Sequence, residues 1–225
     1  MLLSKKKRYL QVAFNSNLNE AYRIIQTLPA SDRIILEAGT PLIKEFGMSA
    51  IQDLYTWWSV KTRPFDLLPY IVADLKTMDR GETEVSLAKR AGASAAICLG
   101  QAPIETINSF IDNCQKTGLD SMIDMMNIDF PINVLRKLKN PPNVVLLHRG
   151  VDEEKFNKDK PIPYIQINKV LSSYDVLISI AGGDTSREVQ RAVFNGASIV
   201  VVWKNFYTVS ETTGKLAEDF LREIK

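Results

Sequence analysis

The stretches Val144-Val-Leu-Leu147 and Ile199-Val-Val-Val202 decide the fold, because neither of them alternates apolar with polar residues. A strand with one face in water reads as an alternation, whereas a strand buried on both faces reads as a nearly continuous apolar run. Strands of the second kind are typical of parallel sheets that helices cover on both faces. The two stretches therefore predict a parallel sheet inside an α/β domain.

Similar short runs recur along the whole chain and alternate with longer amphipathic segments. The predicted strands are Tyr9–Asn15, Arg33–Ala38, Tyr70–Lys76, Ser94–Gly100, Leu119–Met125, Asn143–His148, Asp175–Ala181 and Ser198–Trp203. The predicted helices are Asn19–Thr27, Leu42–Lys61, Glu82–Arg90, Ile104–Thr117, Pro131–Lys139, Ile165–Ser173, Thr185–Asn195 and Ser210–Lys225. The chain therefore reads as eight βα units.

Glycine marks the points where three of these helices are expected to end. Gly92, Gly118 and Gly196 each stand between a helical segment and the apolar run that follows it. Glycine adopts the left-handed conformation that commonly ends a helix without a steric penalty. Eight parallel strands with alternating helices predict a (β/α)8 TIM barrel of the α/β class.

A doubly wound open sheet is the rival fold. It would require a glycine-rich phosphate-binding turn after an early strand, and the stretch Val12-Ala-Phe-Asn-Ser-Asn17 contains no glycine. The longest polar stretch, Asp152–Lys160, is interpreted as a loop above the sixth strand and not as a linker. The whole chain, residues 1–225, is therefore predicted to be a single barrel domain.

Composition and charge narrow the possible classes of protein. A hydrophobic content of 45% and a charged content of 24% exclude a disordered or fibrous chain of 225 residues. The formal net charge of +2 predicts no nucleic-acid partner. No apolar run approaches the ~18 residues of a membrane span, so we expect no membrane partner. Two cysteines and no recognisable signal peptide indicate a cytoplasmic protein.

The chemistry of such a barrel is expected at the carboxyl ends of its strands. The residues that end the predicted strands, or follow them directly, include Asn15, Glu37, Asp74, Lys76, Asp124, His148, Arg149, Gly182 and Gly183. The pattern therefore predicts that three carboxylates, one lysine and the only histidine of the chain meet at one rim.

Asp74 and Lys76 have the i, i+2 spacing that points two side chains to the same side of a strand, here the barrel interior. An interior salt bridge is the structural alternative, but buried charges are costly unless the protein uses them. Glu37 ends the neighbouring strand and, with Asp74, offers hard oxygen ligands. We predict that the two carboxylates bind one Mg²⁺, which keeps few protein ligands and several waters.

Asp124 and His148 end the fifth and sixth predicted strands. Asp124 is expected to act as a third acid or as a partner for Lys76, and a hydrogen-bonding role at the edge of the core is the alternative. His148 is predicted to do acid–base work, because histidine titrates near neutral pH.

Small and cationic residues follow the last strands. Gly182 and Gly183 precede helix-capping residues, so backbone N–H groups and a helix N-terminus would face an anion there. TIM barrels commonly bind phosphate after strands seven and eight. We expect Gly182, Gly183, Arg149 and Lys204 to bind a phosphorylated substrate, with a plain tight turn as the alternative.

Several of these residues belong to longer motifs: Leu10-Gln-Val-Ala13, Glu37-Ala-Gly-Thr-Pro-Leu-Ile-Lys44, Ile71-Val-Ala-Asp-Leu-Lys-Thr-Met-Asp79, Met122-Ile-Asp124 and Ala181-Gly-Gly183. With these motifs the chain resembles the orotidine 5′-monophosphate decarboxylase suprafamily. It most resembles the branch of 3-hexulose-6-phosphate synthase and 3-keto-L-gulonate-6-phosphate decarboxylase. The D-x-K-x-x-D of Asp74, Lys76 and Asp79 marks the suprafamily, and the Glu37 segment marks the metal-dependent branch.

The resemblance implies a Mg²⁺-dependent aldehyde-lyase of the 3-hexulose-6-phosphate synthase type. Such an enzyme adds formaldehyde to ribulose 5-phosphate, or reverses that addition, through a metal-bound enediolate. The resemblance further implies that Lys76 stabilises the enediolate and that a base near His148 moves the proton. Family members are homodimers in which the counterpart of Asp79 reaches the site of the neighbouring subunit, so the resemblance implies a catalytic role for Asp79 across a dimer.

Two strand ends depart from the family pattern. Asn15, which we expect to contact the substrate, stands where the family usually has Asp. Trp203 and Lys204 stand where the family usually has a Gly-Gly or Gly-Arg phosphate grip. Two alternatives therefore stay open: a decarboxylase of the 3-keto-L-gulonate-6-phosphate type, and a catalytically impaired barrel that binds a sugar phosphate.

Overall fold

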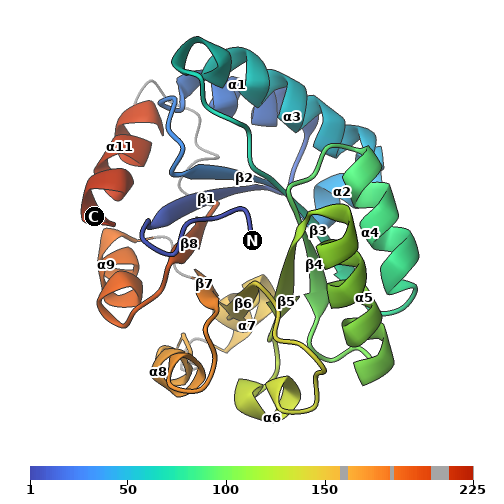
Figure 1. Cartoon of the computed structure of the whole chain (residues 1–225). Coiled ribbons are helices and arrows are strands. Elements are labelled where there is room, and N and C mark those ends of the chain that lie inside the picture. Colours follow the sequence, from blue (N-terminus) through green and yellow to red (C-terminus); the bar gives the residue numbers. More distant parts are fainter. Residues whose placement is uncertain (158–161, 183–184, 204–212, 225) are drawn as a thin grey trace.

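Strands β1 to β8 close into a barrel in the order of the chain, and all neighbouring strands are parallel (Figure 1). The structure is a computed structural model and describes residues 1–157, 162–182, 185–203 and 213–224. The strands are β1 (Tyr9–Phe14), β2 (Ile34–Ala38), β3 (Ile71–Thr77), β4 (Ala95–Leu99), β5 (Asp120–Asp124), β6 (Val144–His148), β7 (Leu177–Ala181) and β8 (Ile199–Val202). The predicted (β/α)8 barrel is confirmed, and the open sheet is excluded because β8 pairs with β1.

The register of the strands sorts the inward-facing side chains into layers. Strands tilt in a barrel, so each layer takes its side chains from alternate strands. If the paired residues are followed around the barrel with a shift of one residue toward the carboxyl end at each strand, one layer consists of Gln11, Val72, Met122 and Ser179. The next layer toward the carboxyl ends is Glu37, Ile97, Leu146 and Val201. Above it lie Ala13, Asp74, Asp124 and Ala181.

The helices surround the strands (Figure 1), and all of them except α7, which has no buried residue, bury apolar residues against the barrel. They are α1 (Leu18–Thr27), α2 (Thr40–Phe46), α3 (Ser49–Thr62), α4 (Gly81–Arg90), α5 (Ile104–Thr117), α6 (Pro131–Leu135), α7 (Val151–Phe156), α8 (Ile165–Leu171), α9 (Ser186–Phe194) and α11 (Thr213–Glu223), with a 3₁₀ turn at Arg63–Phe65. Among the described residues, no helix is both long enough and apolar enough to cross a membrane.

The single helix predicted over Leu42–Lys61 is wrong, because the chain breaks there into α2 and α3. Gly47 has φ 67° and ψ −156°, a conformation that is essentially restricted to glycine and that no helix can contain. The helix predicted over Pro131–Lys139 is too long, since α6 ends at Leu135. The amides of Lys137 and Leu138 donate to carbonyls three residues back, which tightens the chain into turns.

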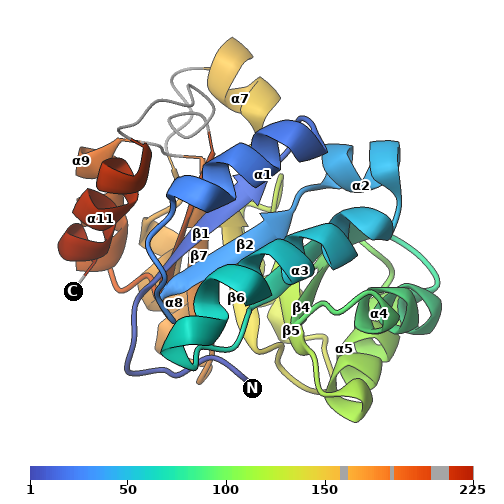
Figure 2. The same cartoon turned by 90° about the horizontal axis from the view of Figure 1, so that it is seen from above.

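The loop predicted over Asp152–Lys160 is also wrong in part, because α7 occupies Val151–Phe156. Acidic residues fill the first turn of α7, where they interact favourably with the helix dipole. The Gly150 amide donates to Oε2 of Glu153 at 3.1 Å and so caps the same end. Figure 2 shows α7 at one end of the barrel, opposite the end at which the N-terminus lies.

The N-terminal segment covers the amino end of the barrel. The backbone amides of Leu2 and Leu3 donate to the buried carboxylate of Asp120 at 2.9 and 3.3 Å. The hydroxyl of Tyr70 donates to the same carboxylate at 2.8 Å. Asp120 is therefore satisfied by hydrogen bonds at the amino end, away from the strand ends where the predicted site residues gather.

Candidate active site

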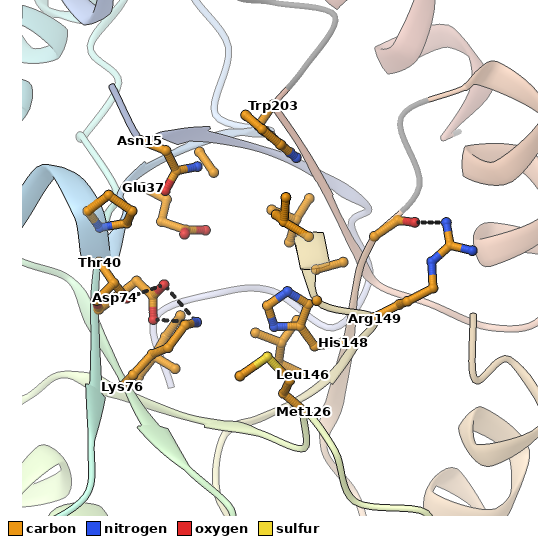
Figure 3. Close-up of a pocket in the computed structure, with 18 of the residues that line it drawn as sticks. Asn15, Glu37, Thr40, Asp74, Lys76, Met126, Leu146, His148, Arg149 and Trp203 are labelled. Carbon is orange, nitrogen blue, oxygen red and sulfur yellow. Dashed lines mark hydrogen bonds and ion pairs between the residues drawn. The ribbon is translucent and has the colours of Figure 1, made fainter. Parts of the chain in front are cut away.

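A cavity of about 440 Å³ opens at the carboxyl ends of the strands. Its floor contains the layer of Glu37, Ile97, Leu146 and Val201. The predicted site residues that line it are Asn15, Glu37, Asp74, Lys76, His148, Arg149 and Gly182. Figure 3 shows Glu37, Asp74 and Lys76 on one wall and His148 across the cavity from them. The strand ends thus bring these side chains into one cavity.

Glu37 on β2 and Asp74 on β3 form a pair of nearly buried carboxylates, with exposed fractions of 7% and 5%. Burial raises the pKa of Glu37 to about 7, and the negative charge of Asp74 adds to the rise. A hydrogen bond from the Gln11 amide opposes the rise. Thr40, at the start of α2, donates its hydroxyl to Oδ2 of Asp74 at 2.9 Å. The two acids repel each other, so the wall that they form favours a cation.

Lys76 lies between two carboxylates. Its Nζ is 3.0 Å from Oδ2 of Asp74 and 3.2 Å from Oδ2 of Asp124. Burial alone would lower the pKa of Lys76, but these carboxylates more than offset that effect and raise it. The Lys76 backbone has a φ of 45°, and the pairing of β3 with β4 shifts register between Ala73 and Thr77. A non-glycine residue rarely adopts this backbone conformation inside a strand, and such outliers cluster at functional sites.

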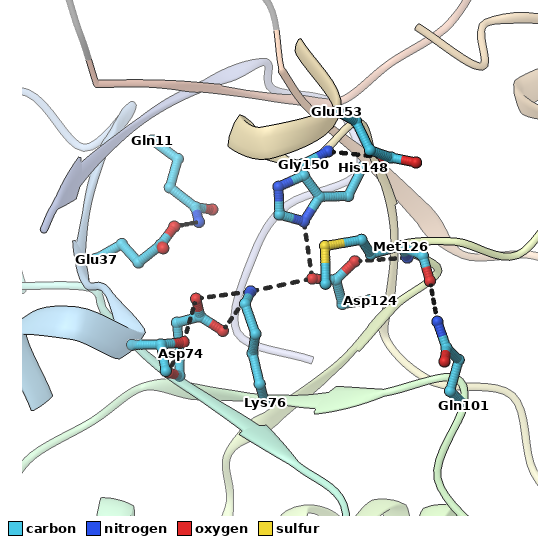
Figure 4. Close-up of polar contacts among 11 residues, drawn as sticks. Gln11, Glu37, Asp74, Lys76, Gln101, Asp124, Met126, His148, Gly150 and Glu153 are labelled. Atoms are coloured by element: carbon cyan, nitrogen blue, oxygen red, sulfur yellow. Dashed lines mark hydrogen bonds and ion pairs between the residues drawn. The ribbon is translucent and has the colours of Figure 1, made fainter. Parts of the chain in front are cut away.

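Asp124 joins Lys76 to His148 (Figure 4). Oδ2 of Asp124 lies 2.9 Å from Nδ1 of His148, and Oδ1 accepts a hydrogen bond from the amide of Met126 at 2.9 Å. Burial would raise the pKa of Asp124, but His148 and Lys76 lower it. Burial would lower the pKa of His148, but Asp124 raises it. A ring that donates from Nδ1 to Asp124 leaves Nε2 as its proton acceptor.

Asn15 is seated against the first turn after β2. A β carbon at Gly39 would lie 2.0 Å from Oδ1 of Asn15 and 2.8 Å from the carbonyl oxygen of Phe14. Only glycine at position 39 therefore lets the Asn15 side chain occupy its place at the rim of the cavity.

Arg149 is tied to the end of β7. Its Nη2 donates to the carbonyl oxygen of Gly182 at 2.6 Å and lies 3.9 Å from Oε1 of Glu188. Gly182 has a φ of 105°, and a β carbon there would lie 2.5 Å from the carbonyl oxygen of Arg149. Arg149 and Gly182 both line the cavity next to the end of β7, and Figure 3 shows the Arg149 guanidinium directed away from the centre of the cavity.

The remaining predicted residues are placed differently. Asp79 is exposed beyond the end of β3 and does not line the cavity. Gly183 and Lys204 lie outside the described residues. Trp203 lines the cavity, at the end of β8 where the family pattern usually has small residues. Asp124 is fully buried and contacts the cavity residues Lys76 and His148.

Sequence reasoning missed Gln11 and Thr40. Gln11 is a lone polar residue in the apolar run of β1, at a position that faces inward, and that pattern could have drawn attention to it. Thr40 follows Glu37 by three residues, across the turn into α2. Each of them touches a carboxylate of the Glu37–Asp74 pair.

The Glu37–Asp74 pair fits a small divalent cation. The described residues contain no group of three or more histidine, cysteine, aspartate or glutamate side chains that could hold a metal ion. Mg²⁺ does not need such a group, because it binds through one or two carboxylates and keeps several waters. Burial is the main cause of the raised pKa of Glu37, and the charge of Asp74 adds to it, so an added positive charge would favour the ionised form of Glu37.

The matching family model is that of the orotidine 5′-phosphate decarboxylase / HUMPS family, and it covers residues 8–204. The chain belongs to this family. The resemblance inferred from the sequence motifs is thereby confirmed.

Relatives and solved structures agree with the family assignment. A protein of Methanoculleus marisnigri described as a bifunctional enzyme Fae/Hps is 40% identical over 96% of this chain and 52% of its own length. The chain thus spans about half the length of the curated relatives that it matches. A crystal structure of a 3-hexulose-6-phosphate synthase matches 96% of this chain and 100% of its own, with 26% identity and a TM-score of 0.79.

A 3-keto-L-gulonate-6-phosphate decarboxylase from Vibrio cholerae shares the fold, with a TM-score of 0.76, 21% identity and coverage of 97% of both chains. The structural neighbours therefore include both enzymes of the branch that the motifs resemble.

The raised pKa of Glu37 makes the stability of the metal-free protein depend on pH. The folded protein keeps a proton on Glu37 up to about pH 7, whereas the unfolded chain loses it near pH 4.5. The unfolded state therefore binds fewer protons in this window, and the unfolding free energy falls as the pH rises, by at most about 1.4 kcal/mol per pH unit. Urea unfolding in chelator is expected to show this fall.

Glu37→Gln is the matched control, because its amide stays neutral at every pH. We expect the unfolding free energy of this variant to lack the Glu37 contribution to the slope between pH 4.5 and 7. Equal slopes for the native protein and the variant would contradict the raised pKa of Glu37.

Proposed function

We propose that this barrel is a Mg²⁺-dependent carbon–carbon lyase of the 3-hexulose-6-phosphate synthase type. Its reaction adds formaldehyde to C1 of ribulose 5-phosphate, or reverses that addition. The observation that carries the proposal is the chain of contacts from Asp74 through Lys76 and Asp124 to His148 at one cavity. The family assignment and the similarity to a 3-hexulose-6-phosphate synthase support it.

The addition requires a carbon nucleophile. A base removes a proton from C1 of ribulose 5-phosphate, and the electron pair spreads over C1, C2 and their oxygens as an enediolate. C1 then attacks the carbon of formaldehyde, so that the new C–C bond forms while the C2 carbonyl re-forms. The oxygen of formaldehyde receives the electron pair of its broken π bond and takes up a proton. The negative charge on oxygen exists only along the reaction path, so groups that stabilise this charge lower the activation free energy of the reaction.

His148 is suited to be the base. Asp124 accepts from its Nδ1, which fixes the ring and leaves Nε2 toward the substrate. The same carboxylate raises the pKa of His148 and so strengthens it as a base.

Lys76 is suited to stabilise the enediolate. Its ammonium keeps its charge between Asp74 and Asp124, because both carboxylates raise its pKa. The side chain is partly open to the cavity, with 24% exposed, so a substrate oxygen can reach Nζ. When bound by Glu37 and Asp74, Mg²⁺ would supply further positive charge for the same oxygens.

Binding of the phosphate is assigned to the rim next to β7. Arg149 supplies a cation that the carbonyl oxygen of Gly182 holds in place, and both residues line the cavity. The proposal extends this site to Gly183 and Lys204, which lie outside the described residues. Asn15 would contact a substrate hydroxyl from the end of β1.

The proposal also places the protein in the cytoplasm. Cys98 and Cys114 are both buried free thiols, which is typical of a reducing compartment.

The direct test is fixation of formaldehyde with ribulose 5-phosphate, followed in Mg²⁺ and in chelator. We expect slow turnover that requires Mg²⁺, because Asn15 is neutral where the family usually has a carboxylate. Asn15→Asp is expected to raise kcat/KM by about 10- to 100-fold, the value of one charge-assisted hydrogen bond. Glu37→Gln is expected to abolish turnover while its circular dichroism spectrum stays native.

The same assay separates the alternatives. Full activity in chelator would overturn the proposed role of the metal. Release of CO₂ from a 3-keto sugar-acid phosphate without formaldehyde fixation would instead identify a decarboxylase. Binding of ribulose 5-phosphate by the native protein and by Asn15→Asp, with no turnover by either, would identify an impaired sugar-phosphate-binding barrel.

A second copy of the chain is the proposed partner. Asp79 is exposed beyond the strand that carries Lys76, where it would reach the cavity of a neighbouring subunit. We expect a homodimer in sedimentation, and we expect Lys76→Ala and Asp79→Ala chains to be inactive alone. Mixing them should restore activity, because one of the two sites of each mixed dimer has both residues intact. A fully active monomer would contradict this assembly.

A further inference from the structure

Gln11 is a polar side chain in the layer directly beneath the floor of the cavity. Its layer contains Val72, Met122 and Ser179, and Gln11 itself is fully buried. An apolar side chain of similar volume would fill the same space without any polar atom to satisfy. Packing of this layer therefore does not explain why residue 11 carries an amide.

The Gln11 amide is aimed upward at Glu37. Its Nε2 donates to Oε2 of Glu37, as Figure 4 shows, and this is the one hydrogen bond that the described residues donate to that carboxylate. Oε1 of Gln11 is buried and has no hydrogen-bond partner among the described residues. If the amide were flipped, Oε1 of Gln11 would face the carboxylate oxygen of Glu37, and two acceptors would repel each other. The contact with Glu37 therefore fixes the orientation in which Nε2 donates.

A buried acceptor without a partner destabilises the folded protein. Ser179, in the same layer, has a buried Oγ that likewise lacks a partner within the described part of the chain. Gln11 and Ser179 thus share a layer, burial and an unsatisfied oxygen, but only Gln11 touches Glu37. The contact with Glu37 is the feature that sets Gln11 apart.

We propose that Gln11 is a positioning residue that holds the Glu37 carboxylate in one orientation, so that its second oxygen, Oε1, stays presented for a divalent cation. The inference rests on the proposed function, because it assigns Gln11 to the metal site of that function. Residues that hydrogen-bond a metal ligand from behind fix its orientation, and their loss typically costs 10- to 100-fold in metal affinity.

The test measures Mg²⁺ binding by calorimetry in the absence of substrate. Gln11→Met keeps an unbranched side chain of similar length but removes the donor, and we expect its Kd for Mg²⁺ to rise by about 10- to 100-fold. The Mg²⁺ concentration for half-maximal activity should rise in parallel, while kcat at saturating Mg²⁺ changes much less. A second variant, Gln11→Asn, keeps an amide but shortens it by one CH₂ group, and it should weaken Mg²⁺ binding similarly.

Ser179→Ala is the matched control, because it alters the same layer without touching Glu37. Its Kd for Mg²⁺ should equal that of the native protein. Native Mg²⁺ affinity in Gln11→Met, with or without a lower Tm, would overturn the inference and leave Gln11 with a structural role. Equal weakening in Ser179→Ala would overturn it as well. A native protein that binds no divalent cation would overturn the proposed metal dependence and this inference with it.

Discussion

The site depends on the confinement of three carboxylates around one ammonium. Lys76 bridges Asp74 and Asp124, while Glu37 stands beside Asp74 with no ion pair of its own within the described residues. With Glu37 ionised and His148 neutral, the cluster carries an excess of two negative charges in a largely buried space. Such an excess is costly without compensation, and burial together with the charge of Asp74 raises the pKa of Glu37. A divalent cation at Glu37 and Asp74 would match that excess.

The layered interior of the barrel separates the buried charges from the apolar core. Apolar side chains of β4, β6 and β8 accompany Glu37 in the floor of the cavity, and charged groups appear mainly at and above that floor. The strands are paired on both sides all around the barrel, so the backbone that carries the charges cannot easily relax. The register shift at the end of β3 and the positive φ of Lys76 then place its ammonium between two acids. Pre-organised charge of this kind is what stabilises an oxyanion along a reaction path.

Much of this arrangement could be predicted from the sequence. Nearly continuous apolar runs locate the strands, and in a parallel barrel the residues at their carboxyl ends must share one rim. Glu37, Asp74 and His148 were placed by that logic alone. The bond between Asp124 and His148 was not predicted, because the pairing of side chains from β5 and β6 depends on register and rotamer. The register shift and the positive φ of Lys76 were not predicted either, because the sequence between Ala73 and Thr77 contains no glycine that would indicate them.

The errors have local causes. Gly47 interrupts an otherwise helical pattern, and its backbone conformation separates α2 from α3. The acidic residues after Gly150 read as a polar loop, although acids at the start of a helix stabilise it. Gln11 belongs to the motif Leu10-Gln-Val-Ala13, but its contact with Glu37 can be recognised only once β1 and β2 are set side by side.

The central claim is that a base on β6 removes a proton from C1 of a ketose phosphate while Lys76 stabilises the charge. Exchange of that hydrogen can be followed by NMR with ribulose 5-phosphate in D₂O, with Mg²⁺ and without formaldehyde. The account predicts that the native protein replaces a C1 hydrogen with deuterium and that His148→Gln slows the exchange by about 100-fold or more. No exchange with the native protein, or an undiminished rate in His148→Gln, would contradict it.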